Sequence, residues 1–70
     1  MNTALLKSII VKNKDTQKRL AEAMGISLST LNAKINGHID FWQSEIEMIR
    51  NRYALDSDEL QAIFFAKEVS

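Results

Sequence analysis

Several residue types that carry chemistry or shape in small proteins are absent or scarce in this chain. The 70 residues contain no cysteine, no proline, one histidine and only two glycines. Without cysteine there are no disulfides or thiolate metal sites, and a single histidine cannot form an imidazole cluster. No apolar run reaches the roughly 18 residues needed to cross a bilayer, and the N-terminus lacks the layout of a cleavable signal. We therefore expect a cytoplasmic protein with no membrane segment and no metal or other cofactor.

Residue patterns typical of enzymes are absent as well. The sequence has no nucleophile–histidine–acid set, no glycine-rich phosphate loop and no group of metal-spaced ligands. The acids Asp56, Asp58 and Glu59 have a simpler explanation at the start of a helix, where Asp56 and Glu59 have the spacing of a capping box. We therefore expect that the protein is not an enzyme.

Charge is balanced overall but uneven along the chain. Nine Lys and Arg residues oppose nine Asp and Glu residues, so the net charge is zero. Residues 1–38 carry six basic and two acidic side chains, a net +4, whereas residues 39–70 carry three basic and seven acidic ones, a net −4. A basic half that touches phosphate and an acidic half that faces away fits a DNA-binding protein. Ordinary solvated faces are the alternative reading.

Helical patterns account for nearly the whole chain, and no stretch alternates as a strand does. With 46% hydrophobic residues and no linker-like segment, the sequence predicts one compact all-α domain over residues 1–70. The five predicted helices cover residues 3–12, 17–24, 28–36, 43–53 and 57–67. The expected N-caps are Thr16, Ser27 and Asp56, and the expected helix ends are Gly25 and Gly37.

Residues 16–37, TQKRLAEAMGISLSTLNAKING, form the most informative stretch. Two short helical patterns meet there at a turn that contains Gly25. At 100° per residue, the inner positions are apolar: Leu20, Ala21 and Met24 on the first helix, and Leu28, Leu31 and Ile35 on the second. The small side chain of Ala21 allows the two helices to cross closely. This is the layout of a helix-turn-helix, whose second helix enters the DNA major groove.

The other face of the second helix carries small and amide side chains, namely Ser29, Asn32, Ala33 and Asn36. An asparagine can donate and accept hydrogen bonds at an adenine edge, a serine can do either, and an alanine methyl can rest against a thymine methyl. Nothing bulky or acidic occupies this face. The pattern favours contact with base edges, and an ordinary solvent-exposed helix face is the alternative.

The same stretch resembles the helix-turn-helix of the Cro-type (XRE-like) family of phage repressors and small bacterial regulators. The matching residues are Gln17, Leu20, Ala21, Met24, Gly25, Ile26, Ser27, Ser29, Thr30, Leu31, Asn36 and Gly37, and beyond them Phe41, Glu45, Ile46, Ile49, Asp58, Glu59, Leu60 and Phe64. The resemblance implies a compact five-helix, lambda-repressor-like domain. It also implies a sequence-specific transcriptional regulator that binds double-stranded DNA, most simply a repressor that occupies an operator.

The resemblance assigns roles to positions of this chain. Base contacts fall on Leu28, Ser29, Asn32 and Ala33, and phosphate contacts fall on Gln17, Lys34, Asn36 and the backbone near Gly37 and His38. Leu28 stands where many relatives have a polar residue, so a thymine methyl is the contact open to it. Lys34 stands where many relatives are apolar. We expect its amine to reach out of the domain toward phosphate while its stem lies along the edge of the core.

A single domain of this size offers too little contact for high affinity. We therefore expect a homodimer, formed in solution or only on DNA, that binds a near-palindromic operator with two recognition helices about 34 Å apart. The fourth and fifth helices are the expected interface. Phe64 and Phe65 are adjacent and cannot both face the core, so one of them is a candidate for self-association. Coverage of that ring by the C-terminal tail is the alternative.

Two readings stay open at the sequence level. Trp42 either fills the corner between the third and fourth helices or is partly exposed. Exposed aromatic side chains and the neutral net charge keep an alternative function open, in which the helix-turn-helix fold serves as a protein-interaction module of an antitoxin-like or adaptor kind.

Overall fold

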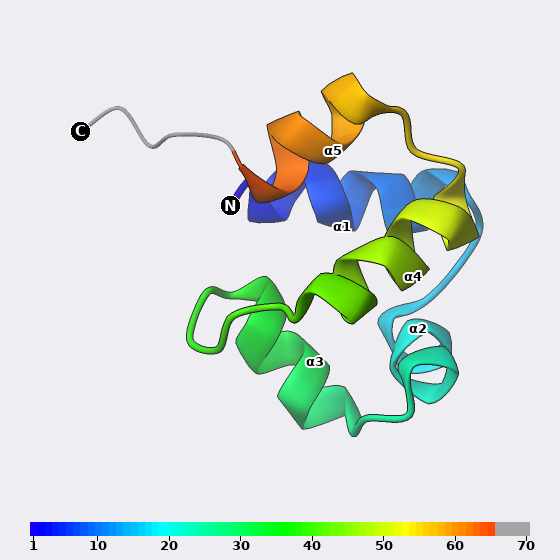
Figure 1. Ribbon diagram of the computed structural model, residues 1–70. Helices are drawn as coiled ribbons and strands as arrows, with labels where there is room; N and C mark the ends of the chain where they lie inside the picture. Colours follow the sequence, from blue (N-terminus) through cyan, green and yellow to red (C-terminus); the bar gives the residue numbers. More distant parts are fainter. Residues whose placement is uncertain (66–70) are drawn as a thin grey trace.

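Five helices and their connections make up residues 1–65, the part of the chain that the computed structural model describes (Figure 1). They are α1 (Thr3–Lys12), α2 (Gln17–Met24), α3 (Leu28–Ile35), α4 (Gln43–Tyr53) and α5 (Ser57–Phe64). Residues 1–65 contain no strand, so the prediction of an all-α, five-helix fold is confirmed. Two helix ends differ from the predicted ones. Asn36 caps α3 instead of continuing it, and α5 ends at Phe64; residues 66 and 67 of its predicted range lie outside the described residues.

The starts of α2, α3 and α5 follow from their capping residues. Thr16 Oγ1 accepts a hydrogen bond from Arg19 N at 3.1 Å, and Ser27 Oγ accepts one from Thr30 N at 3.1 Å. At α5, Asp56 Oδ1 accepts from Glu59 N at 2.8 Å and Glu59 Oε1 accepts from Asp56 N at 3.2 Å. Each bond satisfies a backbone donor that the helix itself leaves without a partner. The three N-caps predicted from sequence are therefore confirmed.

Two helix pairs and a crossing helix enclose one apolar core. α2 packs against α3 and α1 packs against α5, and Figure 1 shows α4 running between these two pairs. The fully enclosed core side chains come from all five helices: Leu6, Leu20, Leu31, Ile35, Ile49 and Ile63. Because α3 contributes only its inner side to this core, its other side is left at the surface.

The N-terminus fixes the end of α3 in place. Thr3 Oγ1, at the start of α1, donates a hydrogen bond to the carbonyl of Ile35 at 2.7 Å. Asn2 N donates to the carbonyl of Ile63 at 2.7 Å, which ties the same terminus to α5. The last turn of α3 is therefore hydrogen-bonded to the start of α1, and the residue just before α1 is hydrogen-bonded to α5.

Candidate nucleic-acid interface

α2 and α3 form a two-helix unit whose turn is set by Gly25. Its φ of +72° lies in the left-handed region, which a residue without Cβ adopts at little cost. Ile26 N then donates to the carbonyl of Ala21 at 3.0 Å, and Ser27 caps the next helix. Ala21 is buried at the contact between the helices. The turn and the small side chain together hold α3 against α2 in the arrangement that the sequence predicts.

The outer side of α3 carries the side chains expected to read bases. Ser29, Asn32 and Asn36 are exposed, Ala33 is half-buried, and Leu28 is 42% exposed. Leu31 and Ile35, on the inner side, are fully buried. The predicted division of α3 into an inner apolar side and an outer polar side is confirmed, except that Leu28 lies at the surface and not in the apolar stripe. Contact of the outer side with DNA stays a prediction.

The residues expected to contact phosphate lie at two places beside α3. Gln17 is half-buried at the first position of α2, where the backbone N–H groups and the helix dipole favour an anion. Asn36, Gly37 and His38 are exposed at the other end of α3. Polar side chains therefore stand at the start of α2 and at the end of α3.

The expected backbone contacts at Gly37 and His38 need correction. Gly37 N donates to the carbonyl of Lys34 at 3.2 Å, and His38 N donates to the carbonyl of Ala33 at 2.9 Å. These bonds close the end of α3, with Gly37 at a φ of +83°. Because both N–H groups already have acceptors inside the protein, the side chains of Asn36 and His38 are the donors that remain for a phosphate.

The expectation that Lys34 reaches outward is wrong. Only 5% of the residue is exposed, and its Nζ lies 2.6 Å from Glu45 Oε1 in α4. The same ammonium group lies 3.5 Å from the carbonyl of Asp40 and 5.2 Å from the centre of the Trp42 ring. A buried ammonium group needs a counter-charge and acceptors, and Glu45 and the loop before α4 supply them.

Glu45 also shows what signal could have revealed this pair. It is the third residue of α4, and its Oε1 accepts a hydrogen bond from Trp42 N at 2.8 Å. A glutamate at that position is a common helix-start residue, and Lys34 lies three residues after Leu31 on the inner side of α3. The inner-face position of Lys34 is a sequence signal for a buried ammonium group, whereas the identity of its partner depends on how α3 and α4 pack.

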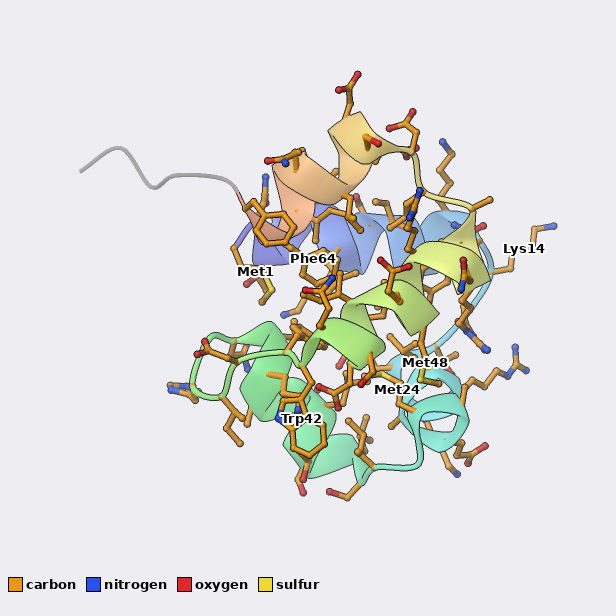
Figure 2. The ribbon with its side chains drawn as sticks, viewed as in Figure 1. Met1, Lys14, Met24, Trp42, Met48 and Phe64 are labelled. Carbon is orange, nitrogen blue, oxygen red and sulfur yellow. The ribbon has the colours of Figure 1, made fainter. Side chains whose placement is uncertain are left out.

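The direction of Lys34 changes the charge of the candidate interface. Among residues 28–38, only Lys34 carries a formal charge when His38 is neutral, and Glu45 offsets it. The exposed basic side chains of the N-terminal half lie on α1, α2 and the loop between them: Lys7, Lys12, Lys14, Lys18 and Arg19. Figure 2 shows Lys14 pointing away from α3. The outer side of α3 is therefore polar but uncharged.

A second ion pair, which sequence reasoning missed, joins the loop before α2 to the end of α4. Arg52 Nε lies 2.7 Å from Asp15 Oδ2 and its NH2 lies 3.2 Å from Oδ1, while the Tyr53 hydroxyl donates to Oδ2 at 2.7 Å. The hydrogen bond from Arg52 holds the pKa of Asp15 well below its usual range. Burial, with the hydrogen bond to Asp15 as a second cause, raises the pKa of Tyr53.

The aromatic residues divide between core and surface. Phe41 and Phe64 meet edge to face, with ring centres 5.4 Å apart, and both pack against the core. Trp42 is 70% exposed and Phe65 is 50% exposed. Of the two readings of Trp42, the structure favours the exposed one, and Phe65 is the outward member of the Phe64–Phe65 pair.

Within residues 1–65, no three His, Asp or Glu side chains gather as metal ligands would. Over the same residues, no helix is both long and apolar enough to span a bilayer.

Comparison with known proteins found no family model, no curated protein and no solved structure that matches this chain.

Proposed function

We propose that this protein binds double-stranded DNA in a sequence-specific manner and regulates transcription, as a small phage or bacterial repressor of the Cro type does. The observation that carries the proposal is the outer side of α3. It presents Ser29, Asn32 and Asn36 to solvent on a helix whose inner side and both ends are fixed by packing and hydrogen bonds. A rigid helix with exposed amide and hydroxyl groups has the chemistry that reads base edges in the major groove.

In this proposal α3 lies in the major groove. Asn32 makes paired hydrogen bonds with an adenine edge, Ser29 bonds a neighbouring base, and Ala33 and Leu28 lie against thymine methyls. Gln17 on one flank and Asn36 with His38 on the other bond to phosphates, which fixes the register without reading sequence. Lys34 has no place among these contacts, because its ammonium group is held by Glu45.

The uncharged outer side of α3 affects how strongly the proposed DNA affinity should depend on salt concentration. Each phosphate neutralised by a lysine or arginine steepens the decline of log K with log salt by about 0.9. Because α3 carries no unpaired cation, such contacts within residues 1–65 fall to basic side chains elsewhere, above all those of α1, α2 and the loop between them. We therefore expect a shallower salt dependence than that of a repressor with cationic recognition helices, and most of the affinity for the cognate site to come from hydrogen bonds.

The proposal includes a homodimer on a near-palindromic site, because a single small module buries too little DNA surface for high affinity. A groove with a volume of about 350 Å³ lies between the N-terminus, the loop before α4 and the end of α5. Its lining includes Ile39, Phe41 and Phe65. Exposed apolar side chains around a groove support self-association at this place. In sedimentation experiments with the operator duplex, Phe65→Lys should bind as single subunits that fill the two half-sites independently, while Val11→Lys, a change at a still more exposed apolar residue of α1, should leave the dimer intact.

The central test is selection of random duplexes on the purified protein, followed by affinity measurements on the selected site. Asn32→Ala should cost about 1–3 kcal/mol at that site and relax the preference at one base pair. Asn51→Ala, the same change at an exposed position of α4, is the matched control and should bind as the parent does. If Asn32→Ala weakened every duplex equally, direct reading by this residue would be wrong.

A protein-interaction module is the second candidate, favoured by the neutral outer side of α3 together with exposed Leu28, Trp42 and Phe65. Selection separates the two functions. A DNA-binding protein enriches one duplex, and its affinity falls as salt rises. The second function would be indicated if the protein enriched no duplex and instead bound another protein with an affinity that hardly changes with salt.

A further inference from the structure

Trp42 occupies a position where its side chain helps neither its own helix nor the core. It is the N-cap of α4, a place where serine, threonine, aspartate or asparagine accept a backbone hydrogen bond, and its side chain makes no such bond. At this helix start the side chain of Glu45 accepts a hydrogen bond from the backbone N–H of Trp42 itself. The ring is 70% exposed. A large exposed residue that breaks a local rule of helix formation indicates a site with another role.

The ring lies beside α3. Its centre is 5.2 Å from Lys34 Nζ, and Lys34 shares one side of α3 with Thr30, four residues earlier. Thr30 and Ala33 are half-buried, whereas Ser29 and Asn32 are exposed, so this side is the border of the outer face. Figure 2 draws the Trp42 ring in front of α3. Trp42 therefore flanks the candidate recognition helix on the side toward α4.

The dimensions of DNA determine what a ring in this place would meet. The major groove is about 12 Å wide, and an α-helix with its side chains is about 10–12 Å across. A helix in the groove fills its width, so a group beside the helix meets the sugar-phosphate strand and not a base. An indole has an N–H that can donate to a phosphate oxygen and an apolar ring that can rest on deoxyribose. Within residues 1–65, no side-chain hydrogen bond involves the indole N–H of Trp42.

We propose that Trp42 is a DNA-backbone contact, its indole N–H bound to a phosphate and its ring against the adjoining sugar, on the flank of α3 toward α4. This inference rests on the proposed function, and it supplies part of the phosphate contact that the inward Lys34 does not make. The buried Lys34–Glu45 pair positions it, because Glu45 holds the backbone of Trp42 and Lys34 lies under the ring.

Trp42→Ser gives a test in which folding and binding should separate. Serine is a good N-cap, so the variant should keep or regain the helix start and unfold at a similar denaturant concentration. Its affinity for the selected duplex and for an unrelated duplex should fall by the same factor, about tenfold or more, because a lost bond to a charged phosphate weakens all sequences alike. Trp42→Phe, which keeps a ring and loses the N–H, should lie between the parent and Trp42→Ser. Val11→Ala, at an exposed residue of α1, should bind as the parent does.

The chain reports on this contact directly, because Trp42 is its only tryptophan. Titration with unlabelled duplex should change the emission of Trp42 and protect it from acrylamide, with the same midpoint as binding to labelled duplex. A parent protein that binds DNA while Trp42 stays equally open to quencher, or a Trp42→Ser protein that binds as the parent does, would overturn this inference and leave the proposed function standing. Loss of affinity that follows only from dissociation of a dimer, seen by sedimentation, would overturn it too. A parent protein that binds no duplex overturns both.

Discussion

Two ion pairs join distant parts of this chain, and they are built differently. Lys34–Glu45 connects α3 to α4 and is closed to solvent, with side-chain exposures of 5% and 9%. Asp15–Arg52 connects the loop before α2 to the end of α4, and its arginine side chain is 34% exposed. Asp15 receives hydrogen bonds from Arg52 and Tyr53, whereas Lys34 depends on one carboxylate oxygen and a distant carbonyl.

Because they differ in burial, the two ion pairs should respond to different perturbations. Both charges of a buried pair have lost their hydration. If one partner is removed, the other stays buried with neither water nor a counter-charge. A pair with one open side can return its surviving partner to water. The first pair should therefore be the more sensitive to substitution. The stability that the second pair contributes should depend on pH, because hydrogen bonds from Arg52 and Tyr53 lower the pKa of the Asp15 carboxyl.

The largest effect is expected for Glu45→Ala. This change leaves the Lys34 ammonium buried without a counter-charge and Trp42 N without its acceptor. Breaking a buried pair costs about 3–5 kcal/mol, which is most of the stability of a small domain. Urea denaturation followed by circular dichroism measures it. Glu47→Ala is the control, since Glu47 and Arg50 form an open pair at 3.6 Å, and its effect should stay below about 1 kcal/mol. Equal losses in the two variants would contradict the burial argument.

Lys34→Ala belongs to the same comparison. It leaves the Glu45 carboxylate buried, so the free energy of unfolding should fall by an amount of the same order as for Glu45→Ala, about 3–5 kcal/mol. A weaker DNA complex of this variant would then reflect a less stable α3. If Lys34→Ala kept the parent stability and lost affinity for all duplexes, the outward lysine expected from the sequence would be right after all.

A smaller effect is expected for Asp15→Asn. The amide keeps the shape of the carboxylate but loses the charge that Arg52 binds, while Arg52 can turn to water. We expect a loss of about 1–3 kcal/mol, as for a hydrogen bond to a charged group. The measurement is again urea denaturation, with Asp40→Asn, at an exposed loop residue, as the control. A loss larger than that of Glu45→Ala would reverse the ranking of the two pairs.

Acid should affect the Asp15 pair in a defined window. The pKa of Asp15 is lowered in the folded protein, and an unfolded aspartate titrates near 3.9. The folded state therefore binds fewer protons, so this stabilisation is complete above about pH 5 and is lost as pH falls below about 4 toward the folded pKa. Denaturation from pH 7 to pH 2 should show the difference in stability between the parent and Asp15→Asn shrinking in that range. A constant difference would mean that the carboxylate charge does not carry the interaction.

The helix caps could be predicted from the sequence, whereas the two ion pairs could not. The starts of α2, α3 and α5 were predictable because Thr16, Ser27 and Asp56 act on backbone atoms three residues away. The side of α3 that faces outward followed from helical periodicity. The ion pairs were not predictable in this way, since Asp15 and Arg52 are 37 residues apart and no periodic pattern links them. Lys34 was misplaced because a lysine is usually exposed, and only the fold brings Glu45 to it.

The smallest effect is expected for Tyr53→Phe. The ring remains to fill its place in the core, and Asp15 keeps Arg52, so the loss at pH 7 should be about 1 kcal/mol. The pKa of the hydroxyl is raised by burial and by its bond to Asp15. Folding therefore favours the protonated phenol, and this contribution is complete below about pH 10 and is lost as pH rises through the folded pKa. Tyr53 is the only tyrosine, so its ultraviolet absorbance follows ionisation directly. In Asp15→Asn the midpoint should fall but stay above that of a free tyrosine, because burial remains; a midpoint that equals the parent's would remove Asp15 as a cause.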